Sequence, residues 1–383
     1  MTRAILQPDS RQSSYLRRFV GGLTVLLLMS HQPHLLLVAA ASLLPAFVAA
    51  QDPAAPRLIA SGIELTLGAR LQTQFATTSV DGEPPSELFI RRARIELGIK
   101  VDDRVSGVVH PDFGNDDVEL KDAYLKLTFS PGLQFLAGKA YRPFGLLEQT
   151  SSKRMLPIER GLRIRGLAAR DEYALTSGLS YSNRDIGVQV LGTPDGNALG
   201  FSYAAGVFRG PLHGEVGDQD SYQFAARVTM RPASALRLGA GWSSRDFSDG
   251  ISATPDLERG NAFEVDLEYG SFAPGIHVLA EVSRGDLDPF TDATFWGAHV
   301  WLAFRSRELG ASGTALEPVL RASYAKTESD AGAAVVPGGT LLTPGINLYL
   351  GALNRLMLNY DYWLGADGSE DARSVKAMFQ LGF

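Results

Sequence analysis

Apolar and polar residues alternate along most of the chain after residue 61. In residues 62–75, GIELTLGARLQTQF, Leu65 and Leu67 fall on one parity and Gln72 and Gln74 on the other. A period of two is typical of a β-strand with one apolar and one polar face. No stretch after residue 50 has the longer period of a convincing amphipathic helix. The pattern therefore predicts an all-β fold.

Sixteen segments with this period follow one another, an even number that puts both ends of the sheet on the same side. Fourteen or eighteen strands are the alternatives. We predict strands near residues 62–76, 88–101, 104–113, 120–130, 132–142, 183–192, 198–209, 220–230, 235–246, 260–270, 275–284, 294–305, 315–326, 340–351, 355–365 and 373–383.

The connections between these strands alternate between short and long. TPDGN (193–197) and RPAS (231–234) are short and rich in turn residues, whereas RDFSDGISATPDLERG (245–260) is long and acidic. A soluble sandwich has no reason to sort its loops in this way. Outer-membrane barrels have short periplasmic turns and long outer loops.

The last predicted strand runs to the carboxyl terminus without a polar tail. Val375, Phe379, Leu381 and Phe383 share its apolar face. In a soluble domain such an edge would invite aggregation, whereas in a membrane barrel the edge pairs with the first strand and the apolar face meets lipid. We therefore predict an all-β fold, a transmembrane antiparallel β-barrel of about 16 strands with a wide polar lumen.

Residues 1–50 carry the one long apolar stretch of the chain. Arg17 and Arg18 precede it and small residues end it at Ala50, which is typical of a cleaved signal peptide. We predict cleavage after Ala50 and a barrel domain over residues 51–383 in the outer membrane of a Gram-negative bacterium. A retained helical anchor is the alternative.

Composition excludes several functions. The chain has no cysteine, and therefore no disulfide, thiolate metal site or cysteine nucleophile. Its net charge of −6 becomes −9 once residues 1–50, with four Arg and one Asp, are removed. A generally basic surface for nucleic acid is not expected.

Candidate catalytic and metal-binding residues are few. His277 and His299 have inward parity on neighbouring strands, but they belong to no recognisable catalytic spacing, and HExxH is absent. Asp286, Asp288 and Asp292 could offer oxygen ligands to calcium, but the full loop pattern is missing. We interpret these residues as lumen lining and a solvated outer loop, and predict no enzyme, no metal site and no cofactor.

One connection, residues 143–182, is much longer than the others. Between Lys139 and Arg170 there are eight basic residues and two acidic ones, a net charge of +6. Long loops in a compact domain are usually functional or disordered. This segregation of charge predicts that the insertion is functional.

Four segments resemble the phosphate-selective porin O and P family of bacterial outer membranes. They are LFIRRARIELGIKV (88–101), KDAYLKL (121–127), LAGKAYRPFGLLEQTSSKRMLPIERG (136–161) and PGINLYLGALNRLMLNYDYW (344–363). The resemblance covers nearly all of the chain after residue 50 and implies a homotrimer of sixteen-stranded barrels, each with a loop folded inward as a basic constriction. By position, the constriction and anion-binding residues would be Arg142, Lys153, Arg154, Arg160, Arg163 and Arg165.

Alternation aims further charged side chains at the lumen, because a charge on the lipid face costs about 2 to 4 kcal/mol at midplane. Arg91 and Lys139 have outward parity and are expected at an interface or a bulge. Acidic residues also point inward, so a continuous basic ladder is not evident. The predicted basic lining is Arg92, Arg94, Lys100, Lys126, Arg227, Arg237, Arg245 and Arg321, and the predicted acidic lining is Glu64, Glu96, Glu264, Asp266, Glu268, Glu281 and Asp361.

These observations predict a passive porin, a water-filled channel for small anionic solutes such as phosphate. The net charge of the whole chain favours cations, but salt screens charges beyond about 10 Å at 0.1 M, so a basic constriction should outweigh distant acidic loops. Expected partners are small inorganic anions, outer-membrane lipid and lipopolysaccharide. The alternatives are a general or cation-preferring diffusion porin of the same fold, and then a barrel enzyme or an adhesin.

Overall fold

The computed structural model describes residues 56–60, 62–115, 117–210, 221–248, 256–310, 313–329, 336–351, 353–366 and 369–383. The predicted signal peptide lies outside these residues. The two helices of more than three residues in the described part are α3 (Leu146–Gln149) and α4 (Glu172–Gly178). No helix among the described residues is long and apolar enough to span a membrane.

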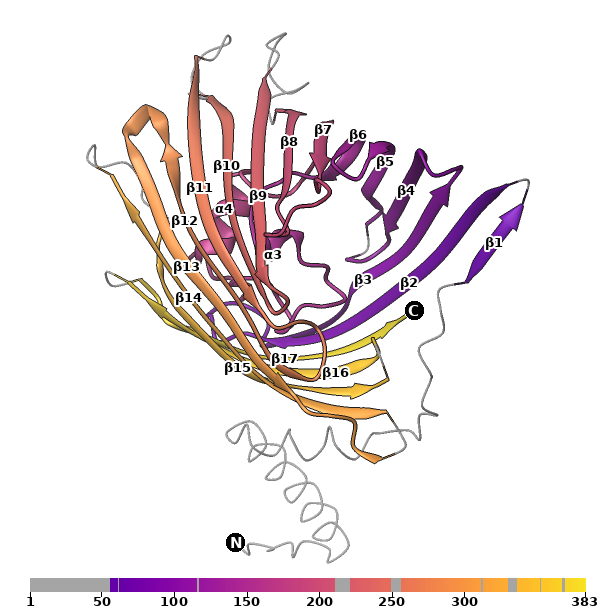
Figure 1. Cartoon of the computed structure of the whole chain (residues 1–383). Helices are drawn as coiled ribbons and strands as arrows, with labels where there is room; N and C mark the ends of the chain where they lie inside the picture. Colours follow the sequence, from indigo (N-terminus) through magenta and orange to yellow (C-terminus); the bar gives the residue numbers. More distant parts are fainter. Residues whose placement is uncertain are drawn as a thin grey trace, which may run out of the picture. The chain divides into compact units, whose positions relative to one another are not determined.

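Sixteen strands, β2 to β17, pair with their neighbours in sequence order, and β17 pairs with β2 to close an antiparallel barrel (Figure 1). The predicted fold class is therefore confirmed. The strands are β2 (Ile63–Thr77), β3 (Ser86–Lys100), β4 (Val105–Asp112), β5 (Glu119–Ser130), β6 (Leu133–Tyr141), β7 (Arg184–Gly192), β8 (Ser202–Arg209), β9 (Tyr222–Ala233), β10 (Leu236–Ser248), β11 (Leu257–Tyr269), β12 (Gly275–Asp288), β13 (Ala293–Arg305), β14 (Thr314–Glu328), β15 (Gly339–Leu350), β16 (Arg355–Gly365) and β17 (Ala372–Gly382).

Four small elements were not predicted: the helices α3 and α4 of the connection between β6 and β7, one strand and one turn. The four-residue strand β1 (Arg57–Ala60) pairs with the start of β2. A single 3₁₀ turn, η1 (Pro289–Thr291), joins β12 to β13. Both lie at the ends of longer strands, where a pattern of period two gives no signal.

The end of the chain closes the barrel. β17 pairs with β2 from Lys376 to Gly382. The N–H of Phe383 then donates to the carbonyl oxygen of Ala69 at 3.2 Å, and the N–H of Ala69 donates to the carbonyl oxygen of Phe383 at 3.3 Å. The apolar terminal strand is thus paired on both sides.

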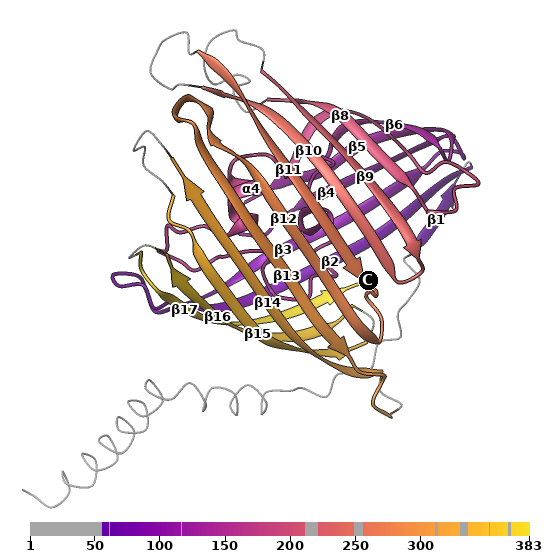
Figure 2. The ribbon, with the colours of Figure 1, turned by 60° about the vertical axis from the view of Figure 1, so that its left-hand side comes forward.

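The outer face of the wall is apolar. Leu125, Val188, Phe263, Val265 and Ile276 are all exposed on it. Their neighbours of opposite parity face inward, and the strands run obliquely around the barrel (Figure 2). Exposed apolar side chains on a closed barrel form the belt that lipid covers.

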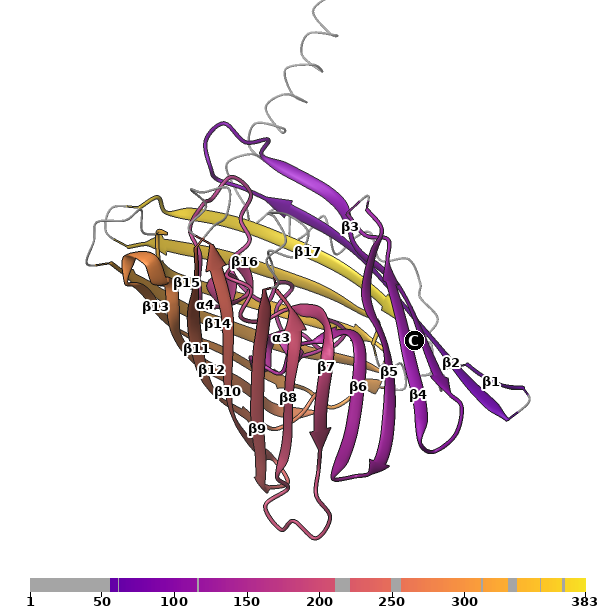
Figure 3. The same cartoon turned by 90° about the horizontal axis from the view of Figure 1, so that it is seen from above.

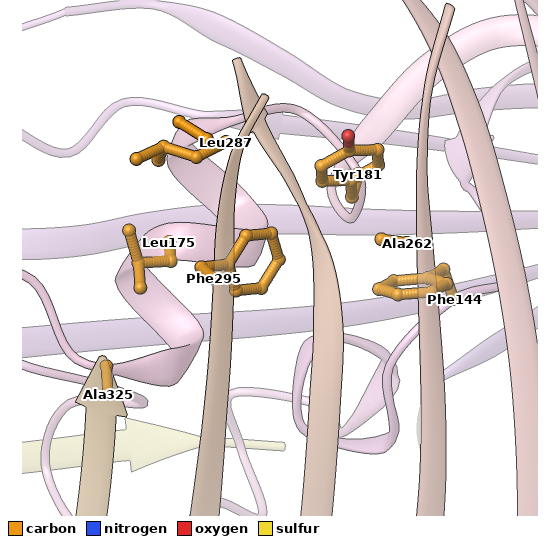
Figure 4. Close-up of a cluster of buried hydrophobic side chains, with 8 residues drawn as sticks. Phe144, Leu175, Tyr181, Ala262, Leu287, Phe295 and Ala325 are labelled. Atoms are coloured by element: carbon orange, nitrogen blue, oxygen red, sulfur yellow. The ribbon is translucent and has the colours of Figure 1, made fainter. Parts of the chain in front are cut away.

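The buried core lies inside the barrel, because residues 142–183, between β6 and β7, fold into the lumen (Figure 3). Phe144, Leu175 and Tyr181 of this inward loop pack with Ala262 of β11 and Phe295 of β13 (Figure 4). A sheet closed on itself has a polar interior unless something covers part of it. Here the inward loop covers part of the wall.

Candidate functional site: the lumen and its inward loop

Apolar contacts hold the inward loop against one side of the wall. Leu147 and Leu156 lie in a buried cluster with Leu279 of β12 and Trp301 of β13. Farther along the loop, Ile158 is buried with two methionines of β16 and β17. The inward positions of β11 to β17 that touch the loop are thus partly apolar.

Polar side chains of the same wall bind the backbone of the inward loop. Asn359 accepts a hydrogen bond from the N–H of Ile158 at 2.7 Å. Lys376 donates to the carbonyl oxygen of Arg163 at 2.6 Å. Arg355 donates to the carbonyl oxygen of Lys153 at 3.1 Å. These bonds fix the path of a segment that has little secondary structure of its own.

Arg321 is the most heavily used of these anchors. Its Nη1 donates to the carbonyl oxygens of Glu159 and Gly161, each at 2.8 Å. Its Nη2 lies 2.7 Å from the Oδ1 of Asp361, which also pairs with Lys376. Arg321 was predicted to line the lumen, but it is only 1% exposed. The side chain of Arg321 faces inward as predicted. The inward loop covers it, so Arg321 holds the loop and does not line open lumen.

Two of the six predicted constriction cations bind structural partners. Arg160 is buried and donates to the carbonyl oxygens of Leu147 at 2.9 Å and Thr150 at 2.6 Å, within the loop itself. Lys153 forms an ion pair with Glu96 of β3. Neither charge is free to meet a solute alone.

Arg165 joins the inward loop to the connection between β2 and β3. Its guanidinium lies 3.2 Å from Glu83 and 3.1 Å from Glu87. The next residue, Gly166, has a φ of 82°, and a Cβ built there would lie 2.5 Å from the Cγ of Glu83. Only glycine fits this close approach. Arg165 therefore sits in a packed contact with two carboxylates.

The other three predicted constriction cations lie apart from one another. Arg154 is exposed and has no ion pair among the described residues. Arg163 is half exposed, with Glu159 3.9 Å away. Arg142 is buried at the start of the loop, near Ser182 at its end. The six side chains do not form one cluster.

The wall cations are also divided. Arg94 pairs with Asp112 at 2.6 Å, and Arg227 pairs with two carboxylates of β11. Arg92 donates to Gln72, while Arg245 donates to the loop carbonyl of Leu179. Lys126 has no ion pair in the part of the chain that the structure describes.

Arg91 points inward because of a β-bulge. Gln72 of β2 pairs with Arg92, and Thr73 pairs with Ile90, so Arg91 is the extra residue of β3. Its guanidinium binds both carboxylate oxygens of Glu159 in the inward loop, at 2.8 and 3.0 Å. Burial raises the pKa of this loop carboxylate, but Arg91 outweighs it and holds the pKa well below its usual range. The expected bulge is present, and it supplies a loop anchor.

A cavity of about 820 Å³ lies between the inward loop and strands β8 to β12. Arg237 and His277 both contact its one carboxylate, Glu268, at 2.8 and 2.9 Å. Arg154 of the loop and Arg231 of β9 have no ion pair among the described residues. The charged side chains that line it are Lys153, Arg154, Arg227, Arg231, Arg237 and Glu268. Lys153, Arg227 and Arg237 are bound to carboxylates, so Arg154 and Arg231 are the cations of this basic chamber without a described ion pair.

Carboxylates gather behind the loop, on the wall side. Glu264 of β11 accepts from the N–H of Gly145 at 3.3 Å, and Glu281 of β12 accepts from the N–H of Leu147 at 3.1 Å. Both are buried. Both bind the backbone at the start of α3, and Glu264 also pairs with Arg227, so it offsets one of the cations that line the chamber.

Glu172 of α4 lies in the same acidic region. Ser283 donates to its carboxyl group, while Asp171 and Glu264 are near. Burial, opposed by the bond from Ser283, raises the pKa of Glu172 from its ordinary value of 4.5 to about 8. The docked loop therefore keeps a proton that a released loop would lose.

This shift predicts that docking of the loop weakens as pH rises from about 5 to about 8, because the docked state binds more protons over that range. We expect single-channel current noise to be greater at about pH 8 than at about pH 5. Glu172→Gln should remove the dependence, since the amide stays neutral. Equal noise at both pH values in the wild type would contradict this expectation.

Two anchors of the inward loop and one cation of the chamber were missed by sequence reasoning. Arg231, Arg355 and Lys376 were not among the predicted lining residues, although Lys376 lies on the polar face of the last strand. Asp171 caps α4 by accepting from the N–H of Ala174 at 3.0 Å. The sequence carries this signal as an Asp directly before a Glu.

Among the described residues, no group of His, Asp and Glu is arranged to hold a metal ion.

The barrel is similar to solved outer-membrane proteins. It matches OmpT of Vibrio cholerae with a TM-score of 0.57 at 14% identity, over 86% of this chain and 100% of that chain. It matches the outer membrane channel DcaP of Acinetobacter baumannii with a TM-score of 0.55 at 14% identity, over 88% and 100%. OmpF of Salmonella typhi matches with a TM-score of 0.54 at 10% identity, over 85% and 100%. At these identities the likeness shows the fold alone.

No curated protein matches the chain in sequence. The family model for phosphate-selective porin O and P matches residues 65–269, which is more than half of the chain. That range begins within β2 and contains β3 to β11 and the whole inward loop. With the closed barrel and its polar lumen, the match identifies a channel and not an enzyme: the chain belongs to the phosphate-selective porin O and P family and has the barrel of an outer-membrane porin.

Proposed function

We propose that this porin prefers small anions, with phosphate among its solutes. The supporting observation is the basic chamber, where Arg154 and Arg231 have no described ion-pair partner and the one lining carboxylate, Glu268, is already bound to Arg237 and His277. A passing ion experiences the charges within a few ångströms far more strongly than those beyond a Debye length. Rings of charged side chains set the selectivity of other pores in this way.

Liposome swelling tests this proposal. Vesicles that contain the purified barrel should swell faster in an anionic solute than in a cationic solute of similar size. Equal rates would favour a general diffusion porin, and faster swelling with the cation would contradict anion preference. A neutral solute of matched size provides the control for pore number.

We also propose that the chain is exported with a signal peptide cleaved after Ala50 and that it assembles as a homotrimer in the outer membrane. The apolar outer face supports membrane insertion. A trimer form of OmpT of Vibrio cholerae, which this barrel resembles, supports the oligomer. Crosslinking of outer-membrane fractions, with intact-mass analysis of the product, tests both points.

A further inference from the structure

A small cavity of about 190 Å³ lies at the rim of the barrel where β7 separates from β8. β7 pairs with β6 from Arg184 onward, but its described ladder with β8 begins only at Gly187. At the end of β8, Arg209 pairs with Tyr222 of β9. The cavity lies in the notch that the first residues of β7 leave beside β8, on the side of the inward loop.

The rim notch is strongly basic. Arg184 pairs with Asp122 of β5 at 2.8 Å, and Lys139 lies 3.8 Å from Glu119. Arg209 is exposed and has no ion pair among the described residues. The charged side chains that line the notch are Lys139, Arg142, Arg184, Arg209 and a single carboxylate, Asp185.

The inner end of the notch carries polar groups whose hydrogen bonds are incomplete. Arg142 is 2% exposed, and its Nη2 donates to the carbonyl oxygen of Ser182 at 2.5 Å. Its Nε and Nη1 have no partner among the described residues. Gln223 is 1% exposed, and its Oε1 also has no hydrogen-bond partner among the described residues. Both side chains line the cavity.

A buried guanidinium with two unmade hydrogen bonds is costly. Burial lowers the pKa of Arg142 to about 10, so the group stays charged near neutral pH. An oxyanion supplies an acceptor for Nε or Nη1. Because these two atoms lie on different edges of the guanidinium group, a bidentate anion would pair one of them with the second N–H of Nη2. The amide of Gln223 can donate or accept, which suits a phosphate with one proton.

We propose that the rim notch is a binding site for a phosphate-type oxyanion, held by Arg142 at its inner end and by Lys139 and Arg209 at its mouth. The anion could come from solution or from the phosphorylated headgroup of a lipid, because Ile186, a neighbour of Lys139 on β7, is an exposed apolar residue of the wall. The rim notch and the basic chamber share no lining residue, so binding in the notch does not depend on the chamber.

Calorimetric titration of the purified barrel with inorganic phosphate, in detergent free of phospholipid, tests the first source. We expect saturable binding that Arg142→Gln weakens about tenfold or more, since charge-assisted bonds are lost. Arg142→Lys should fall between, because one charge remains without the planar fork. Arg104→Gln, which removes an exposed cation from the turn between β3 and β4, should bind like the wild type.

Arg209→Gln keeps the proposal testable if the buried variant fails to fold. Arg209 is exposed, and its substitution should weaken binding about threefold or more without loss of the barrel. For the second source, the barrel is incubated with vesicles that contain lipopolysaccharide or its dephosphorylated form, and the retained lipid is measured by mass spectrometry. If the barrel retains lipid only when the lipid carries its phosphate and Arg142 is present, the bound anion is the phosphorylated headgroup.

Two results would overturn the site. One is wild-type barrel that binds neither inorganic phosphate nor phosphorylated lipid. The other is binding that Arg142→Gln and Arg209→Gln leave unchanged. Ion selectivity of the pore is a separate measurement. A cation-selective channel would contradict the proposed function, but it would not decide whether the rim notch binds phosphate.

Discussion

Replacing Arg321 with alanine should release the inward loop and raise single-channel conductance. Arg321 is 1% exposed, donates to two loop carbonyl oxygens and pairs with Asp361. Removal of one partner of a buried ion pair typically costs about 3 to 5 kcal/mol when the remaining charge is left without a partner. The cost here should be smaller, because Asp361 keeps its pair with Lys376, and it includes the loss of the two bonds to the loop. The barrel ladder does not depend on this side chain, so the cost should fall on loop docking.

Two comparisons make the Arg321 result specific. Arg321→Lys keeps the charge, but its single ammonium nitrogen does not span both carbonyl oxygens and Asp361 as the planar guanidinium does, so it should also raise conductance, though less. Trypsin should cut the loop faster in both variants than in the wild type. Unchanged conductance and unchanged cleavage in Arg321→Ala would mean that the apolar contacts of the loop hold it without this anchor.

Reversing the charges of Arg154 and Arg231 together should abolish or invert anion preference. At about 4 Å, one unit charge changes the energy of an ion by about 1 kcal/mol in bulk water, which is about fivefold in relative permeability. Reversal counts each charge twice, so the double variant should change the ratio by more than tenfold before screening is considered. The permeability ratio of chloride to potassium is the measurement.

Arg104→Glu is the matched control, because it also reverses the charge of an exposed cation but lies in a short turn away from the chamber. It should leave the ratio near that of the wild type. Arg163 and Arg165 test the chamber less directly: Arg165 is held by Glu83 and Glu87, so its reversal would first disturb the contact between the two loops. A double variant at Arg154 and Arg231 with wild-type selectivity would show that the filter lies elsewhere.

The barrel could be predicted from sequence because each strand records its environment locally. The alternation that includes Gln72 and Gln74 predicts a face turned toward the lumen, whichever strands pair with this one. Both residues are buried inside the barrel. The apolar last strand required a partner, which pairing with β2 supplies. Strand count and connection lengths follow from the same one-dimensional pattern.

The path of the inward loop could not be predicted in this way. Its anchors depend on which wall residue meets which loop atom, as with Lys376 and the carbonyl oxygen of Arg163. One signal was present: Leu279 and Trp301 are apolar at inward positions, where a water-filled lumen favours polar residues. Apolar residues on both faces of a strand indicate a covered wall, and β12 and β13 lie under the loop.

Charge counting was the least reliable guide to the site. The net charge of +6 between Lys139 and Arg170 counts cations equally, yet Arg160 binds loop carbonyl oxygens and Arg165 binds carboxylates. Arg231, outside that segment, faces the chamber without a described ion pair. Parity alone places Arg91 on the outer face, and the bulge expected there turns its side chain to the opposite face.

The reversal potential of the wild-type barrel in a planar bilayer, under a gradient of KCl, tests the central claim most directly. The basic chamber predicts a potential with the sign of chloride selectivity, which weakens as salt concentration rises because screening shortens the reach of Arg154 and Arg231. A potential with the sign of potassium selectivity, at low as well as high salt, would contradict the account: the acidic residues would then set the selectivity of the pore.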